Sequence, residues 1–150
     1  MTTSVNLNDV IEHIYPLIDE GGLEAYRNLS KPERVFFATW PAGCEICNGG
    51  FAQYYRDSYA FAAVDCPEAY RTIGAAECAD IIETANKKFG ESGPARDRAK
   101  RKEQLGGIAA TEFEKLEDAF YKCDEDTTTM LEEFVAENIE HFSVYADRVE

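Results

Sequence analysis

Apolar residues recur every three or four positions along nearly the whole chain, and this spacing limits the fold more than any other feature of the sequence. The clearest stripes run through residues 7–18 and 78–89, where the apolar positions share one face of a helix. No stretch shows the sustained period-two alternation that is typical of a half-buried strand. The spacing predicts an all-α fold, with about seven to nine helices in a single compact domain over residues 1–150.

Glycine, proline and capping residues mark where these helices should begin and end. Gly21-Gly22 favours the end of the first helix. Ser30-Lys31-Pro32-Glu33 has the form of a capping box, so we expect a helix to begin there. That helix should end at Pro41, because proline disfavours helical geometry in the residue before it. Cys66-Pro67 should open another helix, which breaks near Gly74.

The charge of the chain is strongly uneven. The formal net charge is −14, whereas a small domain stays dispersed with a net charge of about 2–8. Residues 87–102 hold seven lysines and arginines against Glu91 and Asp97. This basic segment is interpreted either as a solvated, mobile helix whose cations pair with acidic helices, or as a surface that contacts a partner or closes a dimer. The cations concerned are Arg96, Arg98, Lys100, Arg101 and Lys102.

The acidic remainder limits what the protein can bind. Nucleic acids and anionic lipids are bound by neutralising negative charge with lysine and arginine, so neither is an expected partner of this chain. The amino terminus has no basic region before an apolar run, and no segment approaches the roughly 18 apolar residues of a membrane span. We therefore expect a cytoplasmic protein that binds a cationic protein.

Cysteine usage also favours a reducing compartment. The five cysteines are odd in number and show no disulfide framework; they are Cys44, Cys47, Cys66, Cys78 and Cys123. The Cys44-x-x-Cys47 pair has the spacing of half a zinc site, but a structural zinc site needs a second close pair of ligands. We expect neither a metal nor a cofactor.

Acidic side chains form rows on three of the expected helices. Four residues of helix advance about 6 Å, close to the per-strand phosphate spacing implied by two stacked base pairs, so carboxylates at i and i+4 can imitate neighbouring phosphates. The alternative is that these rows are ordinary solvated helix faces. The candidate partner-binding residues are Glu132, Glu133, Glu137 and Glu140 in one row, Glu114, Glu117 and Asp118 in a second, and Glu77, Asp80 and Glu83 in a third.

A glycine pair interrupts the helical pattern in the first half of the chain. Each glycine inside a helix costs about 1 kcal/mol relative to alanine, so an adjacent pair needs a reason. One reason is close packing or a sharp helix entry, and the other is the approach of a partner's backbone, with side-chain amides nearby as hydrogen-bonding groups. The motif comprises Glu45, Asn48, Gly49, Gly50, Phe51, Gln53 and Tyr54.

The run Asn48-Gly49-Gly50-Phe51-x-Gln53-Tyr54-Tyr55 resembles the signature of a DNA-mimic-protein-like family of acidic, all-helical bacterial proteins. Later segments are similar as well, so the resemblance covers about residues 30–142. It implies a homodimer that presents carboxylates to a DNA-binding protein and competes with that protein's DNA. It brings no catalytic residues.

The favoured function is an acidic protein-binding module that competes with DNA for a basic DNA-binding protein, such as a transcription regulator. An alternative is an immunity-type inhibitor of a basic toxin or nuclease, since such a protein uses the same electrostatic attraction. A small enzyme that uses carboxylates near the glycine pair is less favoured. The chain has two histidines, and neither belongs to a nucleophile motif or a His-x-x-x-His arrangement.

Overall fold

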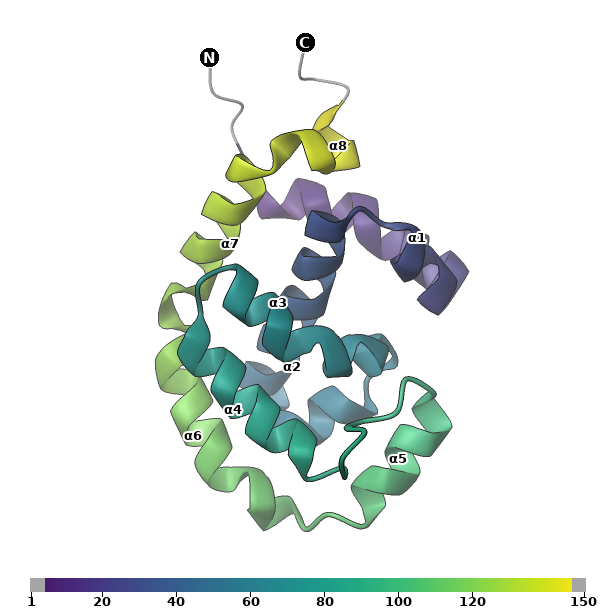
Figure 1. The fold of residues 1–150 in the computed structure, drawn as a ribbon, viewed down its shortest axis with the longest axis vertical. Helices are drawn as coiled ribbons and strands as arrows, with labels where there is room; N and C mark the ends of the chain where they lie inside the picture. Colours follow the sequence, from purple (N-terminus) through teal and green to yellow (C-terminus); the bar gives the residue numbers. More distant parts are fainter. Residues whose placement is uncertain (1–4, 147–150) are drawn as a thin grey trace.

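The computed structural model describes residues 5–146, and over this range the protein is all-α, as the apolar spacing predicted (Figure 1). None of the helices within this range is both long enough and apolar enough to cross a membrane. The α-helices are α1 (Leu7–Asn28), α2 (Lys31–Arg56), α3 (Cys66–Thr72), α4 (Ala76–Lys87), α5 (Arg98–Gly106), α6 (Glu114–Cys123), α7 (Thr127–Glu137) and α8 (Ser143–Ala146). Short 3₁₀ turns η1 (Ser58–Asp65), η2 (Ala110–Phe113), η3 (Asp124–Asp126) and η4 (Ile139–His141) join several of them.

Helix α1 follows the first apolar stripe and is kinked where the glycine pair lies. The Asn6 side chain accepts a hydrogen bond from the backbone N–H of Asn8 at 2.9 Å and caps the helix start. Gly22 has φ 57° and ψ −140°, a conformation that glycine adopts without a steric penalty. The chain then resumes a helix as far as Asn28, so helical geometry is interrupted at Gly22, where the end of the first helix was expected.

Helix α2 begins at the predicted capping box and continues beyond the predicted end. The backbone N–H of Ser30 donates to Glu33 at 3.0 Å, and the Glu33 N–H donates to the Ser30 hydroxyl at 3.2 Å. The expected end at Pro41 is wrong, because α2 runs through this residue, which is buried. Ala38 and Ala42 on either side of the proline are also buried in the core, so tertiary packing outweighs the local preference of Pro41.

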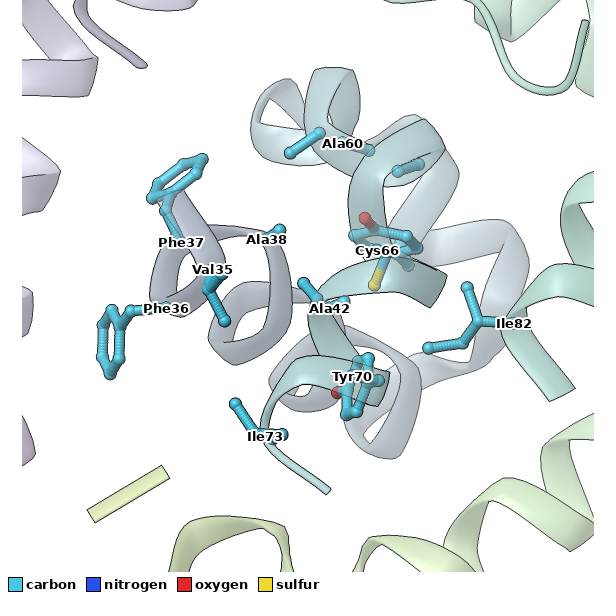
Figure 2. Packing of buried hydrophobic residues seen from close by; sticks show 14 of the residues in the cluster. Val35, Phe36, Phe37, Ala38, Ala42, Ala60, Cys66, Tyr70, Ile73 and Ile82 are labelled. Carbon is cyan, nitrogen blue, oxygen red and sulfur yellow. The ribbon is translucent and has the colours of Figure 1, made fainter. Parts of the chain in front are cut away.

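The core surrounds α2, which contacts α1, α3, α5, α6 and α7. Figure 2 shows Ala42 of α2, Tyr70 of α3 and Ile82 of α4 converging, and each of these side chains is buried. Helix α3 ends just before Gly74, whose φ of 99° produces the predicted break ahead of α4. The apolar faces of α6 and α7 also point inward, which leaves their charged faces at the surface.

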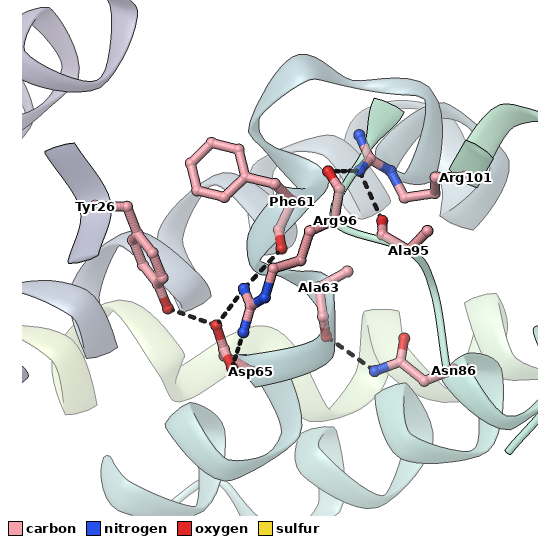
Figure 3. A network of polar contacts seen from close by, with 8 residues as sticks. All are labelled: Tyr26, Phe61, Ala63, Asp65, Asn86, Ala95, Arg96 and Arg101. Carbon is pink, nitrogen blue, oxygen red and sulfur yellow. Dashed lines mark hydrogen bonds and ion pairs between the residues drawn. The ribbon is translucent and has the colours of Figure 1, made fainter. Parts of the chain in front are cut away.

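The basic segment is partly an internal structural element. Arg101 is fully buried, and its guanidinium donates to the carbonyls of Tyr55 at 2.7 Å and Asp57 at 2.8 Å. It also bonds the carbonyls of Ala95 and Arg96, both at 3.0 Å (Figure 3). The carbonyls at the end of α2 are the negative end of its dipole, so a cation there is favoured. The expectation of a solvated helix is therefore wrong for Arg101.

Candidate functional site on the acidic edge

Helices α6 and α7 follow one side of the molecule, at the left of Figure 1, and place an acidic stretch of sequence along it. We call residues 112–140 the acidic edge. It holds eleven aspartates and glutamates against Lys115 and Lys122. Phe113, Phe120 and Leu131 anchor the edge in the core, because all three side chains are buried. The edge is thus a charged surface on a packed support.

The α7 row is the most accessible of the three predicted rows. Glu132, Glu133 and Glu137 are exposed, and within the described residues none of them forms a hydrogen bond or an ion pair. Glu133 and Glu137 are separated by about one helical turn, which places their Cα atoms roughly 6 Å apart. Glu140 lies beyond the end of α7 and has a carboxylate oxygen 3.5 Å from Nε2 of His141.

The α6 row divides between surface and interior. Glu114 and Asp118 are exposed, whereas Glu117 is half-buried. One oxygen of the Glu117 carboxylate accepts the backbone N–H of Phe51 at 3.3 Å. This N–H lies where Gly50, with φ 88° and ψ 178°, interrupts the helical geometry of α2. Glu117 therefore caps the second half of α2 and is less available to a partner than its neighbours.

The α4 row is partly offset by an arginine of the preceding helix. Nη2 of Arg71 lies 3.1 Å from Asp80 and 3.0 Å from Glu83. Glu77 is exposed. Sequence reasoning missed this pairing because Arg71 precedes the α3–α4 turn, and only the turn brings it beside the carboxylates. Opposite charges flanking the glycine of a predicted turn were the one signal for it.

The polar residues of the glycine motif bond one another within α2. The Gln53 amide donates to the Glu45 carboxylate at 2.8 Å, over a span of about two helical turns. A Cβ atom on Gly49 would collide with the Gln53 side chain in this position. Asn48 is exposed and faces solvent. Of the two interpretations of the motif, these contacts support close packing.

The aromatic residues of the motif belong to the core. Phe51 packs against Phe113 and Phe120, with ring centroids 5.7 and 6.0 Å away. Tyr54 is buried beside Tyr55, and their centroids are 5.3 Å apart. The motif thus joins the kink of α2 to the inner face of α6.

Cysteines from three helices gather beside the acidic edge. The Cys47 thiol donates to the Asp124 carboxylate at 3.2 Å. The thiols of Cys78 in α4 and Cys123 at the end of α6 lie close enough to influence each other's pKa, and both cysteines are free. Although Cys47 is exposed, partial desolvation of its thiol, followed by the Asp124 hydrogen bond, raises the pKa of Cys47 to about 12, so this thiol stays protonated at neutral pH. Within residues 5–146, no three side chains of histidine, cysteine, aspartate or glutamate are arranged to hold a metal ion.

Comparison with known proteins gives one match. The family model of the DMP19-like proteins matches residues 27–138, whereas no curated protein and no solved structure matches the chain. This match corrects the assignment to a DNA-mimic-protein-like family. The motif behind that assignment shapes the α2 kink, and a backbone feature of this kind marks a fold and not a binding partner. The chain belongs to the DMP19-like protein family.

Proposed function

We propose that this protein is a binding module for a basic protein and that the acidic edge is the surface that binds. The observation that carries the proposal is the α7 row, in which Glu132, Glu133 and Glu137 are exposed and make no hydrogen bond or ion pair with a described residue. Carboxylates that are already paired would have to break those contacts before they could bind a cation. The α7 carboxylates have no such cost.

The helix beneath the row is packed against the core. Leu131 and Val135 of α7 are buried, and Phe134 packs edge-on against Phe142 with centroids 6.5 Å apart. Binding costs less when the contacting groups are already held in place, because less conformational freedom is lost on association. The helix that carries the α7 carboxylates is therefore held by the core, and its exposed face has one sign of charge.

The partner we propose is a protein that uses lysines and arginines to bind DNA, so that the acidic edge and DNA compete for the same surface. The spacing of Glu133 and Glu137 supports this choice, since about 6 Å suits cations that normally contact neighbouring phosphates. Attraction between extended charged surfaces also speeds association and weakens as salt increases.

The test compares two triple variants with the same change in charge. Glu132→Gln, Glu133→Gln and Glu137→Gln together remove three charges from α7, whereas Glu12→Gln, Glu20→Gln and Glu24→Gln remove three exposed charges from α1. Basic proteins captured from the native cell at low salt are identified, and their affinity for each variant is measured as salt is raised.

We expect the α7 variant to bind the captured protein at least tenfold more weakly and with a shallower salt dependence, whereas the α1 variant stays within about twofold of the unmodified protein. The unmodified protein should also displace DNA from its partner. Equal losses of affinity in the two variants would show that binding depends on net charge and not on the α7 surface. If the protein binds its partner but does not displace DNA, the proposed competition with DNA is wrong.

A further inference from the structure

A hollow of about 530 Å³ lies on the molecule between the end of α1, the start of α2 and α3. Its apolar lining includes Val35, Ala38, Val64 and Ala69. Tyr26 contributes an aromatic wall. Small-molecule sites commonly enclose about 300–1,000 Å³, with a mostly apolar lining and a few polar groups. The volume of the hollow lies in that range, and its apolar residues share the lining with charged ones. None of the lining residues belongs to the acidic edge.

The rim of the hollow is cationic. Arg27 and Lys31 are exposed, and within the described residues neither side chain forms a hydrogen bond or an ion pair. Nη1 of Arg34 donates to the carbonyl of Leu29 at 2.6 Å, which holds the guanidinium at the rim. Three cations therefore surround an apolar floor in a protein whose net charge is −14.

A second charged group at the hollow is internally balanced. Arg96 and Asp65 form a bidentate ion pair (Figure 3), in which each carboxylate oxygen lies 2.9 Å from a different guanidinium nitrogen. The Tyr26 hydroxyl donates to the same carboxylate at 2.8 Å. Because this pair cancels, Glu68 is the one lining carboxylate left to oppose Arg27, Lys31 and Arg34. The hollow thus retains an excess of positive charge.

We propose that this hollow binds a small organic anion, in which a carboxylate or phosphate group contacts the cationic rim and an apolar body covers the floor. Arginine is suited to the anionic group because its planar guanidinium presents paired donors to two oxygens. The volume and concave shape favour a small molecule over a helix of a second copy, which would need a longer groove. The site is independent of the acidic edge and of the function proposed for it.

The experiment uses the full chain and four probes: phenyl phosphate, benzoate, inorganic phosphate and benzyl alcohol. Binding is followed by NMR chemical shifts of Ala38, Ala69 and Thr72, all of which line the hollow. We expect saturable shifts with phenyl phosphate and benzoate, and at least tenfold weaker binding of benzyl alcohol and inorganic phosphate. The difference in affinity between phenyl phosphate and benzoate shows whether the site prefers a phosphate or a carboxylate group.

A matched pair of variants tests the rim. Arg27→Gln with Lys31→Gln removes two rim charges, whereas Lys100→Gln with Lys102→Gln removes two exposed charges from α5. We expect the rim variant to bind at least tenfold more weakly and the α5 variant to stay within about twofold. All four positions are exposed, so both variants should keep the fold, which their NMR spectra will show.

Three outcomes would overturn this proposal. The first is the absence of saturable shifts with either aromatic anion. The second is an equal loss in both variants, which would indicate a non-specific effect of overall charge and not a contact with the rim. The third is the appearance of the same shifts when the protein alone is concentrated, which would make a second copy the occupant. Loss of the α7 carboxylates should leave binding at the hollow unchanged. A negative result at the hollow therefore does not contradict the function proposed for the acidic edge.

Discussion

The carboxylate of Glu117 accepts the backbone N–H of Phe51 at 3.3 Å, at the point where Gly50 kinks α2. This bond joins one acid of the acidic edge to the glycine motif, which lies more than sixty residues earlier in the chain. The motif and the edge are therefore parts of one structural unit. An acidic residue on this edge can be structural even when its neighbours on the same helix face solvent.

Gly50→Ala should destabilise the protein by about 2 kcal/mol or more, because φ of 88° is strained for alanine and its Cβ would collide with Glu117. Gly106→Ala is the control, since a Cβ there meets open space at the end of α5. It should be neutral or slightly stabilising. Urea denaturation measures both free energies of unfolding. Equal stability of the two variants would contradict the strained kink.

Glu117→Ala should lower the free energy of unfolding by about 1 kcal/mol, because the N–H of Phe51 loses its acceptor at the start of a helical segment. Glu114→Ala on the same helix should change it by less than about 0.5 kcal/mol, since Glu114 is exposed. Thermal unfolding followed by circular dichroism compares the two. A larger loss from Glu114→Ala would show that the capping bond contributes little.

Arg101→Met should cost about 3 kcal/mol of stability, because four carbonyls lose their donor in a buried site. Arg101→Lys should also destabilise, since an ammonium group cannot reach carbonyls on several sides at once. Lys102→Met, at an exposed neighbour, is the control and should have little effect. Chemical denaturation of the three variants decides this, and a tolerated Arg101→Lys would argue against the geometric role of the guanidinium.

Asp124→Asn should make Cys47 alkylate several-fold faster with iodoacetamide at pH 8. Partial desolvation contributes most to the raised pKa of this thiol, but the hydrogen bond and negative charge of Asp124 add to it, so removing that charge lowers the pKa and increases the thiolate fraction. Glu125→Gln provides the matched control at an exposed neighbour. Mass spectrometry of the Cys47 peptide gives the rates. Unchanged alkylation in Asp124→Asn would contradict this coupling.

The protein should lose stability as the pH rises from about 9 to about 12. Burial and a hydrogen bond to Asp19 raise the pKa of Tyr59 from 10.0 to about 12, and the pKa of Cys47 rises from 9.0 to about 12. In this window the folded state holds protons that the unfolded chain has released, so unfolding becomes easier with increasing pH. The stabilisation is complete below about pH 9 and is lost as pH passes 12.

Urea midpoints measured from pH 8 to pH 11 test this pH dependence. Tyr59→Phe removes one of the titrating groups and should make the decline shallower, although it also loses the bond to Asp19. A midpoint that is constant or that increases over this range would contradict the raised pKa values.

Local sequence determined the helical class and several helix boundaries. The apolar spacing of α4, the capping box at Ser30 and the break at Gly74 all act over one or two helical turns. Because these signals depend only on residues within one or two turns, they can be recognised in the sequence without knowledge of the rest of the fold. The exposed acids of α7 were predictable for the same reason, since its apolar residues define the inward face and leave the outward face to charge.

Tertiary structure decided the features that depend on distant segments. Helix α2 continues through Pro41 because surrounding helices bury it, and Arg101 is internal because the end of α2 offers it carbonyls. The cationic hollow likewise brings Arg27 of α1 and Arg34 of α2 together above a floor that includes Ala69 of α3. Helical periodicity shows which face of each element points inward. Which faces meet, and which charges are thereby paired or left free, depends on packing among elements far apart in the chain.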